Sequence, residues 1–89
     1  MFSDERECWL CRSPRVHKHH IYGGSRRSDS EREGCWVYLC PEHHNMSNRG
    51  VHFDKRLDDY FKEACQRRWM EREGATEDDF RAIFGRNYL

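Results

Sequence analysis

Two pairs of cysteine and histidine residues have the spacing of zinc ligands. Cys8 and Cys11 stand in the sequence CWLC, and a turn of this kind presents two thiolates to one tetrahedral zinc ion. Cys40 and His43 repeat the spacing in LCPEHH. Cys-x-x-Cys is also the thioredoxin-type redox motif, which is found where a strand leads into a helix of a βαβ unit. Here Ser13-Pro14 follows the motif directly, and no βαβ pattern surrounds it. We therefore predict a structural zinc site, against the alternative of a core thiol at Cys40 and an exposed His43.

Two pairs of adjacent histidines indicate a second site. His19 and His20 follow one another in HKHHIYGG, and His44 follows His43. Side chains alternate faces on a strand and diverge by about 100° on a helix, so one member of each pair can bind a metal while the other stays free. On a helix, Asn48 shares the face of His44. A free histidine suits the activation of water, and a nearby divalent cation would neutralise phosphate charge. The alternative is that these are polar loop and cap residues or one metal cluster.

The elements that must position these side chains follow from the pattern of apolar residues. Residues 16–22 and 35–40 read as two short strands, the first broken by Gly23-Gly24. The charged stretch 25–34 between them is expected to form a loop. Pro41 and Gly50 suit the beginning and the end of a short helix. The predicted fold class is α+β.

Two further helices are predicted after this region. Residues 52–73 carry a stripe at three-to-four spacing that ends near Gly74 and consists of Leu57, Tyr60, Phe61, Ala64, Cys65, Arg68 and Trp69. Thr76 and Asp79 resemble a capping box at the start of a second stripe, Phe80, Ile83 and Phe84. We expect these helices to supply the core. Trp9, Trp36 and Trp69 are expected to pack rather than stack on bases, and Cys35 and Cys65 to be buried thiols.

The composition limits the class of protein. The chain has 89 residues, of which 36% are hydrophobic and 36% charged, so it predicts one small domain that needs added stabilisation such as a bound metal. Five cysteines cannot all pair within one chain. The charged N-terminus resembles no signal peptide, and no apolar run is long enough for a membrane span. A cytoplasmic protein with reduced thiols is expected.

The charge distribution points to an anionic partner near the histidines. The formal net charge is zero, which excludes a non-specific polycation. The stretch from Arg12 to Ser28 nevertheless contains no acidic residue and five basic ones: Arg12, Arg15, Lys18, Arg26 and Arg27. The alternative is that these cations serve only solubility.

The ordered combination of these motifs resembles the HNH family of ββα-metal nucleases. The family pattern is Cys-x-x-Cys, then His-His-Ile, then a strand ending in Leu-Cys-x-x-(Cys or His)-His, with a further ligand four residues on. Here it stands as CWLC, HHI, LCPEHH and Asn48, within residues 8–48. Phage and prophage proteins of this size are common in the family. The resemblance implies one nuclease domain over residues 1–89, with a zinc-bound ββα-metal core at 8–50 and a helical extension at 52–89.

The resemblance also implies roles for individual residues. His20 would be the general base, while His19, His44 and Asn48 would hold the catalytic divalent ion, Mg²⁺ or a transition metal. The substrate would be DNA, with Lys18, Arg26 and Arg27 assisting its binding through phosphates. His17 has no role in this scheme. Cutting both strands with one active site would favour a homodimer. The host would be a bacterial or phage-infected cell.

Two departures from the family pattern matter. The family's middle residue, usually Asn, falls near Cys35 or Trp36, and no Asn stands there. The orientation of His20 must therefore come from another group, such as a backbone carbonyl. His43 stands where Cys is commoner, and imidazole is an acceptable zinc ligand.

Two other classes of function are compatible with the sequence. A zinc-knuckle module that binds nucleic acid or protein without cutting would need the zinc ligands but no convergence of His19, His20 and His44. A recombination or phage accessory factor would act through the C-terminal helices and expose an apolar face around Trp69 and Phe84.

Overall fold

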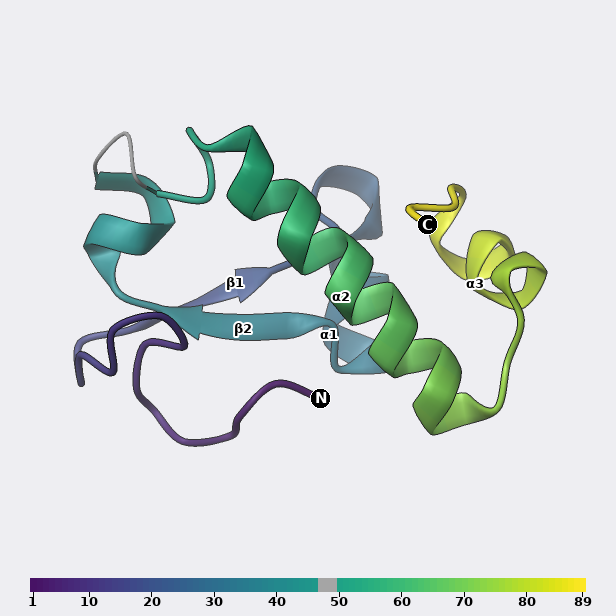
Figure 1. The fold of residues 1–89 in the computed structure, drawn as a ribbon, viewed down its shortest axis with the longest axis horizontal. Helices are drawn as coiled ribbons and strands as arrows, with labels where there is room; N and C mark the ends of the chain where they lie inside the picture. Colours follow the sequence, from purple (N-terminus) through teal and green to yellow (C-terminus); the bar gives the residue numbers. More distant parts are fainter. Residues whose placement is uncertain (47–49) are drawn as a thin grey trace.

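The centre of the fold is a two-stranded antiparallel sheet. The computed structural model describes residues 1–46 and 50–89. Strand β1 (His17–His20) pairs with β2 (Trp36–Leu39) so that His17 lies opposite Leu39 and His20 opposite Trp36 (Figure 1). Since side chains alternate along a strand, the sheet has two different faces. The buried face carries His19, Val37 and Leu39, with His17 at its rim, and the other face carries Lys18, His20, Trp36 and Tyr38.

The connection between the strands is helical, so the prediction of a loop at 25–34 is wrong. A 3₁₀ turn, η1 (Gly24–Arg26), leads into helix α1 (Arg27–Glu33), which ends at Gly34 with φ 75°. The helix is fixed by Ser30, whose Oγ accepts from the amide of Tyr22 at 3.0 Å and donates to its carbonyl at 2.8 Å. Charge pairs three residues apart support it, Asp29 with Arg26 and with Arg32.

A π-helical turn, η2 (Glu42–Met46), follows β2 where a short helix was expected. The amide of His44 donates to the carbonyl of Cys40 at 2.9 Å, which starts the turn. The amides of Val51 and His52 then donate to the carbonyls of His43 and His44 at 2.8 and 3.2 Å, which brings the chain back against the turn. Asn48 lies outside the described residues.

Two C-terminal helices follow, of which the first covers the buried side of the sheet and the second lies beyond the end of the strands (Figure 1). Helix α2 (Lys55–Glu73) starts at Asp54, whose carboxylate accepts from the amides of Arg56 and Leu57, three residues later than the sequence predicted. It passes across the strands and α1 (Figure 1). Helix α3 (Glu77–Phe84) begins with the predicted capping box of Thr76 and Asp79.

The core joins the sheet to these helices through aromatic rings. Tyr22, just after β1, packs on Phe84 at 4.6 Å between ring centroids, and its hydroxyl donates to the carbonyl of Lys62 at 2.6 Å. The predicted burial of both stripes is confirmed for Phe61, Cys65, Trp69, Phe80 and Phe84, and Cys35 is buried as well.

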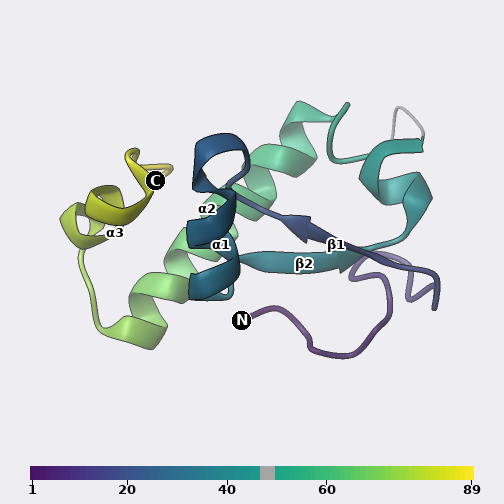
Figure 2. The same ribbon diagram turned by 180° about the vertical axis from the view of Figure 1, so that it is seen from behind.

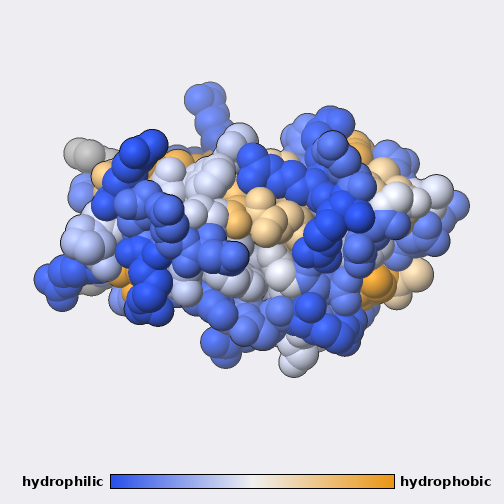
Figure 3. Space-filling view, turned by 90° about the horizontal axis from the view of Figure 1, so that it is seen from below, coloured by the Kyte–Doolittle hydropathy of each residue, from blue (hydrophilic) through white to orange (hydrophobic). Residues whose placement is uncertain are grey.

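Two of the three tryptophans do not behave as predicted. Trp69 is in the core, but Trp9 is 36% exposed and Trp36 is only partly buried on the outer face of the sheet. The predicted apolar face around Trp69 and Phe84 is buried, not exposed. The face seen in Figure 3 is mainly hydrophilic with small apolar patches. None of the described helices is both long and apolar enough to span a bilayer.

Candidate functional site

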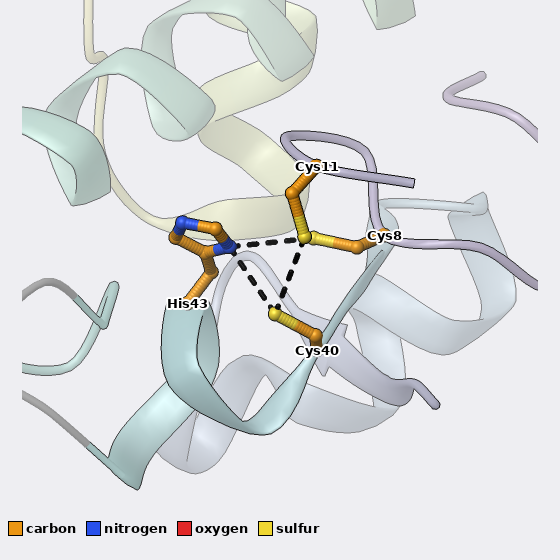
Figure 4. Close-up of side chains that lie close together, drawn as sticks. All are labelled: Cys8, Cys11, Cys40 and His43. Carbon is orange, nitrogen blue, oxygen red and sulfur yellow. Dashed lines mark hydrogen bonds between the residues drawn. The ribbon is translucent and has the colours of Figure 1, made fainter. Parts of the chain in front are cut away.

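The first candidate metal centre consists of Cys8, Cys11, Cys40 and His43, whose ligand atoms all lie within 4.8 Å of one another. Cys40 Sγ is 3.2 Å from His43 Nδ1, Cys8 Sγ is 3.6 Å from the same nitrogen, and Cys11 Sγ is 3.6 Å from Cys40 Sγ (Figure 4). Zn–S bonds of about 2.3 Å in a tetrahedron separate two sulfurs by about 3.8 Å. The four side chains therefore already have nearly the spacing that one tetrahedral ion requires.

Local hydrogen bonds hold the Cys-x-x-Cys turn against the second pair. The amide of Arg12 donates to the carbonyl of Cys8 at 2.8 Å, and the amide of Cys8 donates to Ser13 at 2.9 Å. Arg12 has φ 64°, so the turn is tight. The amide of Trp9 donates to the carbonyl of Tyr38 in β2 at 2.9 Å, which places the turn beside the end of β2, directly before Cys40.

The environment of Cys8 favours a thiolate. Burial raises its pKa, but hydrogen bonds at the backbone of Cys40, Cys11 and Leu10, with one from His43, outweigh that effect and lower the pKa to about 6. A thiolate is the form that binds zinc.

The second candidate metal centre consists of three histidines, His19, His44 and His52, with ligand atoms within 4.8 Å of one another. His44 Nε2 lies 3.0 Å from His52 Nε2. The ring of His19 has its centroid 5.2 Å from the centroids of both other rings. The structure thus brings the predicted His19 and His44 together.

The two inner imidazoles of this centre are held neutral. Burial is the main cause that lowers the pKa of these side chains, and the neighbouring imidazoles lower it further, to about 3 for His19 and about 4 for His44. His19 is 6% exposed, and its Nε2 is buried with no hydrogen-bond partner among the described residues. A buried nitrogen without a partner is costly, and a metal ion would use its lone pair. The three imidazoles therefore fit a divalent transition metal.

Sequence reasoning missed His52, and it gave no role to His17, which lies beside the histidine centre in the structure. His17 Nδ1 lies 3.2 Å from Nδ1 of His44, the nitrogen that stays free when His44 binds a metal through Nε2. Such a partner orients a metal-binding ring. Strand alternation could have indicated His17, since it lies two residues from His19. His52 had no such signal, because its position depends on the turn through Gly50.

His20 points away from this centre, to the other face of the sheet. Its Nε2 is 2.7 Å from Oε2 of Glu31 in α1, and Lys18 Nζ donates to Oε1 of the same carboxylate at 3.0 Å. These hydrogen bonds, the one from His20 first, lower the pKa of Glu31. Arg27 Nε donates to Nδ1 of His20 at 3.3 Å. His20 thus carries its hydrogen on Nε2 and a lone pair on Nδ1. The group that orients it in place of the family's Asn is a carboxylate, whereas a backbone carbonyl was the example suggested by the sequence.

Two of the three predicted DNA-binding cations lie beside His20. An open pocket of about 540 Å³ is lined by Lys18, His20, Arg27, Ser28, Glu31 and Arg32. Arg26 is elsewhere, because its guanidinium donates to the carbonyl of Ile83 in α3 at 3.1 Å. Arg32, which the sequence did not single out, takes its place at the pocket.

No family model, curated protein or solved structure matches this chain significantly.

Proposed function

We propose that this protein is a small HNH-type endonuclease that hydrolyses DNA phosphodiesters with His20 as general base and a divalent ion on the facing histidines. The observation that carries the proposal is the divergence of His19 and His20. One enters a pocket of three imidazoles, and the other pairs with Glu31 beside a basic pocket. A phosphodiester along the open edge of β1 would reach both.

The chemistry of His20 follows from its hydrogen bonds. Nδ1 carries the lone pair that can take a proton from water, once Arg27 turns from it to a phosphate. Glu31 accepts from Nε2 and would stabilise the imidazolium that results. This is the arrangement by which a carboxylate supports a histidine base in other hydrolases.

The donor set of the second centre narrows the choice of ion. Three imidazoles suit transition metals, whereas Mg²⁺ prefers oxygen ligands. We therefore propose His19, His44 and His52 as ligands of a transition-metal ion, with His52 added to the predicted set. A bound ion would stabilise the negative charge on the departing oxygen.

The remaining parts would have supporting roles. Zinc on Cys8, Cys11, Cys40 and His43 would fix the core at 8–50, which the helices at 52–89 extend. Lys18, Arg27 and Arg32 would contact phosphates, while Arg26 would serve the fold.

The test is plasmid nicking with added Mn²⁺, Ni²⁺ or Mg²⁺, comparing the wild type with His20→Ala. We expect nicking by the wild type with a transition metal and its loss in the variant, at equal zinc content. Lys55→Ala, on the exposed start of α2, is the matched control and should cut normally. Equal inactivity of all three proteins would refute the nuclease.

A second candidate is a zinc-knuckle module that binds nucleic acid and cuts nothing, such as a recombination or phage accessory factor. The contact of Arg27 with the lone pair of His20 favours it, because the base is covered while that contact persists. It predicts inert wild type and His20→Ala proteins with unchanged DNA binding.

A further inference from the structure

None of the described helices covers the outer face of the sheet. Seen from behind, the strands β1 and β2 lie in front, and α1 lies at one end of them (Figure 2). Trp36 and Tyr38 lie on this face, partly buried, with ring centroids 5.0 Å apart.

Cations accompany both aromatic rings. Lys18 Nζ lies 4.4 Å from the centroid of Trp36, and Arg6 Cζ lies 5.4 Å from that of Tyr38. The pocket with Arg27 continues the face past His20. Within residues 1–46 and 50–89, neither Arg6 nor Arg27 forms an ion pair with a carboxylate.

The one carboxylate that lines the pocket does not oppose an anion. Glu31 is already paired with Lys18 and His20. The face therefore presents two aromatic rings with a cation over each. Arg27, whose guanidinium donates to His20, has no carboxylate to hold it back from a phosphate among the described residues.

We propose that this face binds an unpaired stretch of nucleic acid, with bases stacked on Trp36 and Tyr38 and phosphates on Lys18, Arg6 and Arg27. Side-chain rings can stack only on bases that have left a duplex, and aromatic residues on an open sheet face with flanking cations are a common way to bind single strands. The strand would run past His20, so the inference rests on the proposed function for what happens next: the substrate would be single-stranded or locally unpaired DNA.

The test is fluorescence anisotropy with a labelled 12-nucleotide oligo-dT and a 12-base-pair duplex, in zinc-loaded protein without further divalent ions. We expect the single strand to bind at least 10-fold more tightly than the duplex. Trp36→Leu and Tyr38→Leu should each weaken its binding on the order of 10-fold. Trp36→Phe keeps a ring and should stay within about 3-fold of the wild type. Tyr60→Leu, at an aromatic residue 48% exposed on α2, should have no effect.

Each other outcome has a defined meaning. Duplex binding that equals or exceeds single-strand binding overturns the inference, and so does unchanged single-strand binding by Trp36→Leu and Tyr38→Leu. Tyr60→Leu overturns it as well if it weakens binding as much as Trp36→Leu and Tyr38→Leu do. Should Trp36→Leu melt below the assay temperature, Tyr38→Leu and Trp36→Phe decide the question. Nicking of duplex DNA without single-strand preference would overturn this inference and leave the nuclease standing. Tight single-strand binding without any cleavage would support this inference and refute the nuclease.

Discussion

The two candidate metal centres meet at neighbouring residues and differ in chemistry. His43 belongs to a set with three cysteines, and His44 belongs to a set of imidazoles only. Four protein ligands with sulfur fill a tetrahedral shell, as in structural zinc sites, whereas three ligands leave a position for water or substrate. The contrast fits the proposed division, in which the cysteine-rich centre would stabilise the fold and the histidine centre would hold the catalytic ion.

The π-helical turn makes this division possible. Consecutive side chains on a helical turn diverge by about 100°, so His43 faces the Cys-x-x-Cys turn while His44 faces His19 on β1. Single turns of π-helix are frequent at functional sites. A shift of this turn would misplace both centres at once, which makes adjacent variants a sharp test.

The largest expected effect is the difference between His43→Ala and His44→Ala. A structural zinc contributes about 10–16 kcal/mol in small zinc domains, so His43→Ala is expected to remove zinc and abolish cooperative melting. His44→Ala should keep one zinc per chain and a cooperative transition while losing the second ion. Native mass spectrometry and thermal melting measure both properties.

His43→Cys is the matched control for this pair, since a thiolate replaces an imidazole in the zinc shell. It should retain zinc and melt cooperatively. Unfolding of His44→Ala to the same extent as His43→Ala would show that the two centres are one structural unit.

The next effect concerns His20 and Glu31, which contribute to neither metal centre. If His20 is the base, His20→Ala should lower the cleavage rate by about 10²–10⁴-fold, the usual contribution of general base catalysis. Glu31→Gln keeps the size of the side chain but removes its charge, so a smaller loss, roughly 10-fold, is expected. Metal content should stay at the wild-type value in both variants. A loss of the second ion in Glu31→Gln would instead indicate a structural role for the carboxylate.

A comparison of His52→Ala with His17→Ala separates ligands from supporting residues in the second centre. We expect His52→Ala to lower the affinity for Ni²⁺ or Co²⁺ more than 100-fold, because it removes one of three ligands. His17→Ala removes only the partner of His44 Nδ1, and such outer partners are worth about 10–100-fold. Titration followed by calorimetry measures both affinities. Equal losses would make His17 a fourth ligand.

The sequence predicted the cysteine-rich centre fully and the histidine centre in part, for physical reasons. Cys8 with Cys11 and Cys40 with His43 are local pairs, so their spacing alone determines a turn geometry. His52 reaches the centre only because the chain turns back through Gly50. A turn of this kind leaves no periodic pattern of apolar residues in the sequence, so it could not be predicted. Helix α1 was not predicted because a polar residue, Ser30, anchors it to Tyr22, so the helix has no apolar stripe in the sequence. The apolar stripes of α2 and α3 were found because their core contacts follow the helical period.

The smallest effect distinguishes two adjacent arginines. Arg27→Ala removes a cation from the pocket beside His20, so it should weaken DNA binding a few-fold and reduce the salt dependence by about one phosphate contact. Arg26→Ala removes a hydrogen bond to the carbonyl of Ile83, which is worth about 0.5–1.5 kcal/mol of folding free energy. It should lower the melting temperature by several degrees and leave DNA affinity unchanged. Anisotropy at several salt concentrations, together with thermal melting, checks both. Reversed results would mean that Arg26 leaves α3 to bind phosphate, and that the proposed DNA-binding surface extends beyond the pocket around His20.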